Sequence, residues 1–322
     1  MKLILPLDLV ADIEPHLPPD TEVVRVDVEG NLDGDASDAE VYFSWFLSRS
    51  PTLHKILEAA PALRWHHAPN AGVNHILTPT YLERDIILTN GAGVHGIPIA
   101  EFVIAYILAH AKHLSELYAL QAERHWKKGF AIQELTDATL LIIGAGGIGQ
   151  EIAARAKPFG LKIIGSRRHP QELPNFDKVV GADEWRSLLP GVDYVVIATP
   201  LTLETKEFID ESVLRWRSPP KASLPKHAYL INIARGGVVD ESALIKALTE
   251  GWIAGAALDT VNSEPLPPES PLWSLPNIFI TPHTSGHSPK SKQRSIALFI
   301  DNLKRYQAGQ PLRNVVDKEA GY

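Results

Sequence analysis

Short apolar runs recur along the first 96 residues of the chain. They cover residues 2–6, 22–26, 41–46, 63–68 and 86–90. Most are rich in β-branched or aromatic residues, which favour strands, and Pro- and Asp-rich connections separate several of them. Strands that alternate with longer helical or loop segments are typical of parallel sheets, so this rhythm predicts a small α/β domain.

From residue 97 to about residue 124 the pattern becomes helical and strongly apolar. Pro98 stands at a position that a first helical turn tolerates. A helix that is apolar over most of its surface packs against more than one partner. We expect one continuous helix here, which connects two domains and contributes to a dimer surface.

A second alternation of strands and helices runs from residue 139 to about residue 283. Its apolar runs cover residues 139–143, 161–165, 178–180, 194–199, 229–234, 255–259 and 277–281. Six or seven strands with intervening helices predict a doubly wound parallel sheet. The tail, residues 288–307, has a helical pattern, and we expect it to return to the first domain.

The length and composition narrow the class of protein. A chain of 322 residues exceeds the size at which one hydrophobic core keeps growing, so two domains are expected. A net charge of −7 argues against nucleic acid or an anionic membrane as the main partner. The absence of cysteine excludes disulfides and thiolate metal sites, and the His and carboxylate spacings predict no metal site. The apolar run at the N-terminus is too short for a signal peptide, so we expect a cytoplasmic protein.

The pattern G-x-G-x-x-G occurs twice, and its context distinguishes the two copies. Gly144-Ala145-Gly146-Gly147-Ile148-Gly149 follows a predicted strand and opens a helix, after which another strand begins at once. This is the βαβ unit whose helix N-terminus binds a pyrophosphate. Gly91-Ala92-Gly93-Val94-His95-Gly96 enters the long helix instead, without a second strand at the required distance. We expect that copy to be an interdomain hinge, where glycine permits unusual φ values.

The strand after the second glycine motif ends in Ser166-Arg167-Arg168, at the place where NAD-binding proteins carry an acidic residue. A carboxylate at this place repels a 2′-phosphate, whereas arginines and a hydroxyl bind one. The segment therefore predicts a preference for NADP(H). The alternative is that both arginines are solvated surface charges and that the protein accepts NAD(H) as well.

Arg235, Glu264 and His283 each follow shortly after one of the last three apolar runs. The ends of parallel strands meet at one edge of a sheet, where ligands bind in α/β folds. Arginine binds a carboxylate through two parallel hydrogen bonds, and histidine exchanges a proton near neutral pH. A neighbouring glutamate favours the charged form of the imidazole. These are the groups that reversible reduction of a 2-oxo acid requires, so we predict a catalytic trio.

Further segments complete a recognisable pattern with the glycine motif and the trio. They are residues 198–202 with Thr205, 232–237 with Val239-Asp240, 255–259, 264–266, 270–273, and 281–283 with Gly286. In these segments the chain resembles the D-isomer-specific 2-hydroxyacid dehydrogenases over nearly its full length. Its basic segment at 166–168 makes it most similar to the glyoxylate/hydroxypyruvate reductases of that family.

The resemblance implies an α/β fold of two Rossmann-like parallel-sheet domains. An NAD(P)-binding Rossmann domain, residues 97–286, is inserted into a substrate domain of the flavodoxin-like type, which residues 1–96 and 287–322 form together. The resemblance further implies a homodimeric oxidoreductase that reduces a small 2-oxo acid to the D-2-hydroxy acid.

The resemblance also implies roles for individual residues. Arg235 binds the substrate carboxylate and carbonyl, His283 is the acid/base and Glu264 pairs with it. Backbone N–H groups at Ala71 and Gly72 complete the carboxylate site. Asp259 contacts the nicotinamide carboxamide. The residues implied at the cofactor are Gly144, Gly146, Gly147, Ile148, Gly149, Ser166, Arg167, Arg168, Thr199, Pro200, Thr205, Ile233, Ala234, Arg235, Asp259, His283 and Gly286.

Two segments depart from the family pattern. The family usually has Asp where this chain has Asn74, which affects only local hydrogen bonding, and residues 217–225 resemble a surface insertion. Related formate dehydrogenases carry an amide in place of Glu264, so formate oxidation is not expected. The alternatives are an NAD(H)-dependent dehydrogenase of another 2-hydroxy acid, an oxyanion dehydrogenase, and a dinucleotide-sensing protein like the corepressors of this fold. The identity of the 2-oxo acid stays open.

Five further residues have both a structural and a functional interpretation. His66 and His67 alternate about a strand, so at most one of them faces the substrate. His95 lies in the hinge loop, and Trp45 is a candidate wall of the substrate pocket. Trp126 is a candidate contact with the partner subunit's site or a surface anchor.

Overall fold

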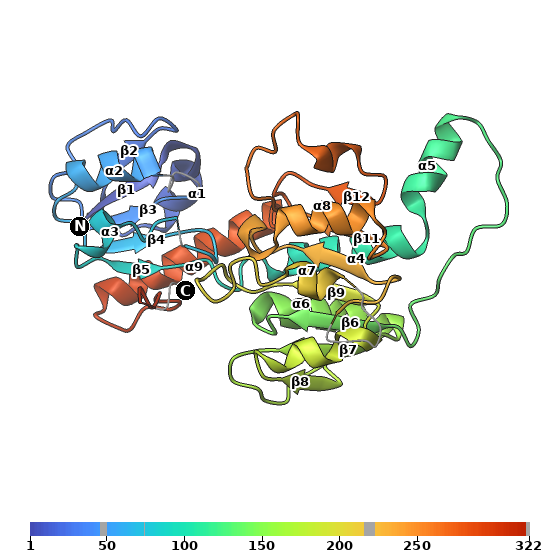
Figure 1. Ribbon diagram of the computed structural model, residues 1–322. Coiled ribbons are helices and arrows are strands. Elements are labelled where there is room, and N and C mark those ends of the chain that lie inside the picture. Colours follow the sequence, from blue (N-terminus) through green and yellow to red (C-terminus); the bar gives the residue numbers. More distant parts are fainter. Residues whose placement is uncertain (46–49, 74, 216–222, 320–322) are drawn as a thin grey trace. The chain divides into compact units, whose positions relative to one another are not determined.

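The computed structural model describes residues 1–45, 50–73, 75–215 and 223–319, and it divides into two compact units (Figure 1). Residues 1–95 and 287–322 form the first unit, and residues 96–286 form the second. Each unit is built on a parallel sheet with helices, so the predicted fold of two parallel-sheet α/β domains is confirmed. Asn74 and most of the predicted insertion at 217–225 lie outside the described residues.

The first unit contains a five-stranded parallel sheet with the strand order β2-β1-β3-β4-β5, which is the flavodoxin-like order. Its strands are β1 (Lys2–Pro6), β2 (Glu22–Val26), β3 (Val41–Phe43), β4 (Trp65–His67) and β5 (Ile87–Thr89). Its α-helices are α1 (Val10–Ile13), α2 (Ser50–Ala59), α3 (Pro79–Leu82) and α9 (Pro289–Gln307). The predicted strand at 63–68 corresponds to the shorter β4, because the apolar run extends beyond the strand into the segments at both ends of β4.

The last helix, α9, packs against strands from the first part of the chain. Ser288 caps it, since the Ser288 hydroxyl accepts a hydrogen bond from the Ser291 N–H over 3.0 Å. Phe299 is fully buried and stacks on Phe43 and on Trp65, with ring centroids 4.7 and 5.3 Å away. Each such aromatic pair adds about 1 kcal/mol to the free energy gained from burial. These contacts hold the C-terminal helix within the first unit.

The second unit contains a seven-stranded parallel sheet with the order β12-β11-β10-β9-β6-β7-β8. Its strands are β6 (Thr139–Ile143), β7 (Lys162–Ser166), β8 (Lys178–Val180), β9 (Tyr194–Ile197), β10 (Tyr229–Asn232), β11 (Gly255–Leu258) and β12 (Ile278–Ile280). Its α-helices are α4 (Gly96–Ala111), α5 (Leu114–Ala122), α6 (Gly147–Ala156), α7 (Glu211–Leu214) and α8 (Glu241–Thr249). The strand order reverses between β6 and β9, and doubly wound sheets bind ligands at such a switch point.

The prediction of one continuous helix over residues 97–124 is wrong. The chain forms α4, breaks at His113 and resumes as α5. His113 has a φ of +53°, and an α-helix cannot continue through this left-handed conformation. The sequence has no glycine or proline at the break to indicate it. Half of the α4 residues are buried, whereas none of the α5 side chains is.

Among the described residues, no single helix combines the length and the hydropathy of a membrane span. Helices α4 and α5 reach both criteria only as a pair, and the two are bent by 66° relative to each other.

Candidate active site

The second glycine motif forms a tight loop at the switch point of the seven-stranded sheet. Gly144 has a φ of +106°, and a Cβ atom built on it would lie 2.6 Å from the carbonyl carbon of Ala198. A Cβ atom built on Gly149 would lie 2.4 Å from the carbonyl oxygen of Gly144. Only glycine fits at these two positions, because any side chain would collide with backbone. The loop therefore packs directly against the end of β9.

The middle of the same loop faces open space. A Cβ atom built on Gly146 or on Gly147 would meet no described atom within 4 Å. Helix α6 begins here without a side-chain cap at Gly146, which leaves its first backbone N–H groups available to a ligand. The Thr199 hydroxyl is buried and has no hydrogen-bond partner among the described residues. An exposed glycine backbone at a helix N-terminus, beside an unpartnered hydroxyl, fits the pyrophosphate of a dinucleotide.

The basic segment after β7 lies beside this loop. The N–H groups of Gly144 and Ala145 donate hydrogen bonds to the carbonyl oxygen of Ser166, at 3.1 and 2.8 Å. Ser166 is buried, Arg167 is half-buried and Arg168 is exposed. The predicted 2′-phosphate residues thus follow the strand end next to the pyrophosphate cradle. The structure brings the two predicted cofactor segments together.

Arg235 follows β10 and is held by a buried asparagine. The Asn232 side-chain amide donates to the Arg235 carbonyl oxygen over 2.9 Å, and its oxygen accepts from the Ala234 N–H over 3.1 Å. The guanidinium group donates to the Ala234 carbonyl oxygen over 2.7 Å. Burial lowers the pKa of Arg235, and the nearby Glu264 charge opposes this shift. The fixed backbone turn presents a cation close to the Glu264 carboxylate.

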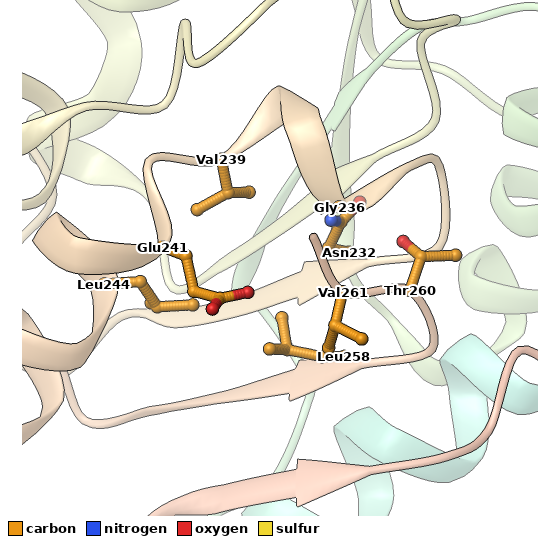
Figure 2. Close-up of a pocket in the computed structure, with 8 residues that line it drawn as sticks. All are labelled: Asn232, Gly236, Val239, Glu241, Leu244, Leu258, Thr260 and Val261. Atoms are coloured by element: carbon orange, nitrogen blue, oxygen red, sulfur yellow. The ribbon is translucent and has the colours of Figure 1, made fainter. Parts of the chain in front are cut away.

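A backbone contact at Gly236 fixes Arg235 relative to the segment that carries Glu264. A Cβ atom built on Gly236 would lie 2.0 Å from the Val261 carbonyl carbon and 2.4 Å from the Asn262 nitrogen. Figure 2 shows the cavity beside this contact, which has a volume of about 10 Å³ and is lined partly by Gly236, Val261 and Thr260. One water is the most that such a volume holds. The cavity is a packing gap behind the site and too small for a substrate.

His283 and Glu264 form a hydrogen-bonded ion pair. Nδ1 of His283 lies 2.8 Å from Oε2 of Glu264, and the other carboxylate oxygen accepts from the Val261 N–H over 3.3 Å. Partial burial acts to raise the pKa of Glu264, but the hydrogen bond and charge of His283 outweigh it and hold this pKa below its usual range. The charge of Arg235 acts in the same direction. The structure therefore brings the predicted trio together.

Asp259 organises the loop that carries His283. Its buried carboxylate accepts hydrogen bonds from the Thr281 hydroxyl at 2.6 Å, from the Thr284 N–H at 3.0 Å, and from both the N–H and the hydroxyl of Ser285. His283 itself has a φ of +50°, and its N–H donates to the Asp259 carbonyl oxygen over 2.9 Å. A left-handed histidine costs of order 1 kcal/mol and persists only where its surroundings enforce it. The predicted contact of Asp259 with the nicotinamide stays a prediction.

The other predicted cofactor residues lie on the same unit. Ile233 and Ala234 are buried after β10, Ile148 and Gly286 are half-buried, and Pro200 is exposed. The Thr205 hydroxyl donates to the Pro200 carbonyl oxygen over 2.7 Å, which closes a tight turn after β9.

The predicted substrate loop lies on the first unit, between β4 and α3. Ala71 and Gly72 are half-buried there, and the Asn90 side chain donates to the Ala71 carbonyl oxygen over 2.8 Å. His95 places its Nε2 atom 2.8 Å from the Pro69 carbonyl oxygen. The half-buried Trp45 packs edge-on against Phe43.

The histidines of β4 are structural. His66 and His67 are both fully buried within the first unit. Nδ1 of His66 lies 3.1 Å from the Tyr81 hydroxyl, and Nδ1 of His67 lies 2.8 Å from the Thr89 hydroxyl. Burial lowers the pKa of each histidine to about 3, so both rings are neutral near neutral pH. Because both rings are enclosed, neither fits the interpretation of a substrate contact.

Three supporting residues were not singled out from the sequence. Asn232 was visible as the polar end of an apolar run, and this signal alone could have indicated a turn-stabilising role. Thr281 follows the same rule at the end of β12. Tyr106, whose hydroxyl lies 2.6 Å from the Thr281 hydroxyl, is on α4, and no spacing in the sequence connects it with His283.

Comparisons with known proteins give one consistent result. The family model for the D-isomer specific 2-hydroxyacid dehydrogenase, NAD binding domain, matches residues 104–285. A glyoxylate reductase of Korarchaeum cryptofilum is 34% identical over 280 residues, which span 85% of this chain and 82% of that protein. A D-isomer specific 2-hydroxyacid dehydrogenase family protein from Aeromonas salmonicida has a similar structure, with a TM-score of 0.85 and 30% identity over 98% of this chain and 99% of its own.

An NADPH-dependent glyoxylate/hydroxypyruvate reductase from Sinorhizobium meliloti, solved in complex with NADP and sulfate, also has a TM-score of 0.85. It is 27% identical and covers 100% of this chain and 99% of its own. The family match falls on the unit that carries the glycine loop and the trio.

Proposed function

The chain belongs to the D-isomer specific 2-hydroxyacid dehydrogenases, and we propose that it reduces a small 2-oxo acid such as glyoxylate or hydroxypyruvate with NADPH as the preferred cofactor. It is an NAD(P)-dependent oxidoreductase, and the product is the D-2-hydroxy acid. The observation that carries the proposal is the ion pair between His283 and Glu264, at 2.8 Å, beside the half-buried Arg235. A dinucleotide sensor that does not catalyse needs no such trio.

The imidazole supplies the proton. When bound, the nicotinamide supplies the hydride that reduces the carbonyl carbon. Glu264 holds Nδ1 of His283, which leaves Nε2 to donate a proton to the carbonyl oxygen. Proton donation requires the protonated imidazole, and the Glu264 carboxylate accepts the hydrogen bond of its Nδ1 atom. In the reverse direction the same nitrogen accepts the hydroxyl proton.

The guanidinium group binds the substrate and stabilises the charge that develops during reduction. Arg235 offers two parallel N–H groups, which match the geometry of a carboxylate. Its partial burial strengthens the interaction, because water screens it less than at the surface. As the carbonyl oxygen gains negative charge, the fixed cation stabilises it without reorganising. The contribution of backbone N–H groups at Ala71 and Gly72, on the first unit, stays a prediction.

The cofactor preference follows from the basic segment at the end of β7. Ser166, Arg167 and Arg168 provide one hydroxyl and two cations where a 2′-phosphate is expected, and they lie next to the Gly144 loop. A carboxylate, which would select NADH, is missing from these three positions. The related S. meliloti enzyme, whose structure holds NADP, is consistent with this assignment.

The second unit is the NAD(P)-binding domain in this proposal, and the first is the substrate domain. The active form is a homodimer, because α5 buries none of its side chains within its own chain and exposes Tyr118, and because Trp126, which follows α5, is exposed as well. Trp126 is 88% exposed, which is exceptional for tryptophan in a monomer. Sedimentation equilibrium tests this point, and a monomeric mass would contradict it. The cytoplasmic location stays a prediction.

A panel of 2-oxo acids assayed with NADPH and NADH side by side tests the proposed function. Glyoxylate, hydroxypyruvate, pyruvate and phenylpyruvate cover the range of side-chain sizes, and oxidation of the reduced cofactor is followed by absorbance. We expect glyoxylate or hydroxypyruvate with NADPH to give the highest kcat/KM. Turnover of none of the four acids would refute the activity, and equal kcat/KM with both cofactors would refute the preference.

A further inference from the structure

Glu204 places a carboxylate on the basic segment that follows β7. The Arg168 guanidinium lies 3.3 Å from Oε2 of Glu204, and both side chains are largely exposed. Arg168 comes after β7, whereas Glu204 belongs to the turn after β9. Because β6 lies between β7 and β9 in the sheet, this ion pair joins the two loops that flank the glycine motif.

The turn that carries Glu204 has a defined conformation. The Thr202 N–H donates to the Thr205 hydroxyl over 2.8 Å, and this hydroxyl donates to the Pro200 carbonyl oxygen over 2.7 Å. Glu204 therefore projects from a turn that side-chain hydrogen bonds close on both sides of it. These bonds fix the backbone at Glu204, from which its exposed side chain reaches Arg168.

The Glu204 carboxylate and a 2′-phosphate compete for the same guanidinium group of Arg168. A phosphate monoester carries a charge of about −1.5 to −2 near neutral pH and binds arginine through the same N–H groups as a carboxylate. An exposed Arg–Glu pair is weak, so a phosphate can displace the carboxylate from Arg168. The displaced carboxylate then remains beside a second anion and repels it.

We propose that Glu204 is a specificity-determining residue, which competes with the cofactor 2′-phosphate for Arg168 and thereby limits the preference for NADPH over NADH. The inference rests on the proposed binding of the 2′-phosphate at Ser166-Arg167-Arg168. Glu204 lowers the affinity for NADPH and leaves that for NADH unchanged, because NADH carries only a hydroxyl at this place.

The test measures equilibrium binding of NADPH, NADH and adenosine 2′,5′-bisphosphate to the wild-type chain and to Glu204→Gln. The bisphosphate isolates the 2′-phosphate from the nicotinamide end. We expect Glu204→Gln to bind NADPH and the bisphosphate about fivefold more tightly and NADH within about twofold of the wild type. The gain should shrink as the salt concentration rises, since salt screens exposed charges.

Two further variants show whether the effect acts through Arg168. Glu207→Gln removes the same charge three residues away, and it should leave all three affinities within about twofold. In an Arg168→Gln background, Glu204→Gln should lose most of its effect, because the group for which carboxylate and phosphate compete is gone. Thermal unfolding of each variant confirms that the fold is retained.

The inference is overturned if Glu204→Gln leaves the affinities for NADPH and the bisphosphate unchanged or lowers them. The carboxylate would then have no effect on phosphate binding, or it would orient Arg168 for the phosphate. An equal gain from Glu207→Gln would also overturn it. Failure of the proposed cofactor preference has a different signature. The wild-type chain would then bind NADPH no more tightly than NADH, whatever Glu204→Gln does.

Discussion

Thr281 stands two residues before His283, and its hydroxyl donates a hydrogen bond to Oδ1 of Asp259 over 2.6 Å. A hydroxyl has one hydrogen, so the Tyr106 hydroxyl, 2.6 Å from the same oxygen, must be the donor to Thr281. A chain of hydrogen bonds thus runs from α4 to the carboxylate that binds the backbone on the far side of His283. It fixes the left-handed conformation of the histidine and the direction of its ring.

Thr281→Val should therefore impair both stability and catalysis. It removes one of the three hydrogen bonds that Oδ1 of Asp259 accepts, and it leaves the Tyr106 hydroxyl without its acceptor. The unpartnered hydroxyl costs about 1–3 kcal/mol in the free energy of unfolding. We expect kcat to fall by roughly tenfold as the imidazole loses its orientation, with little change in the affinity for NADPH. Urea denaturation and steady-state kinetics measure both effects. Thr281→Ser, which keeps the hydroxyl, is the matched control, and equal behaviour of the two variants would contradict the role of the chain.

Gly146→Ala should separate cofactor binding from stability. Its backbone is extended rather than left-handed, and the added methyl group meets no described atom, so the free energy of unfolding should change by no more than about 1 kcal/mol. The methyl group nevertheless occupies space that a pyrophosphate needs at the N-terminus of α6. We expect the dissociation constant of NADPH to rise at least about tenfold, which fluorescence titration measures. Unchanged affinity would show that the cofactor does not approach here.

Gly236→Ala, in contrast, should destabilise the fold. The new methyl group would overlap the Val261–Asn262 backbone, so the segment that carries Glu264 must move. We expect a loss of roughly 1–3 kcal/mol in the free energy of unfolding together with a loss of activity. Gly191→Ala is the control, because its methyl group meets no described atom and its φ is not left-handed. If urea denaturation finds both variants equally stable, the proposed close contact is wrong.

Buried histidines make the protein sensitive to acid. Burial lowers the pKa of His66 and His67 to about 3 and that of His110 to about 4. In the unfolded chain a histidine titrates near 6.5. Above this pH these histidines are neutral in both the folded and the unfolded protein, so they do not make the free energy of unfolding depend on pH. As the pH falls below about 6.5, the unfolded chain takes up protons that the folded protein excludes. The free energy of unfolding should then fall by up to about 1.4 kcal/mol per pH unit for each histidine.

Urea denaturation at a series of pH values between about 7 and 5 measures this slope, in a range where most carboxylates stay ionised. A free energy of unfolding that stays constant over this range would show that the three histidines are accessible to protons in the folded state.

The sequence predicted the trio because chemistry and topology coincide there. Arg235, Glu264 and His283 are polar residues that follow apolar strands, and parallel strands bring such positions to one edge. The break at His113 was not predicted, because the residue that takes the left-handed conformation there is neither glycine nor asparagine, and tertiary packing overrides its preference. The bond between Tyr106 and Thr281 was equally inaccessible, since it joins residues 175 positions apart. Local patterns thus predicted which side chains come together after the ends of the strands, whereas the side chains that hold them emerged only from the packed structure.

The central claim is that His283 donates the proton and Arg235 binds the acid in reduction of a 2-oxo acid by NADPH. The most direct measurement is kcat/KM for glyoxylate together with the dissociation constant of NADPH, for the wild type, His283→Asn and Arg235→Gln. We predict that kcat/KM falls by about 10²–10⁴ in each variant while NADPH binds to His283→Asn within a few fold of the wild type. Reduction at a near-wild-type rate by either variant would contradict the account.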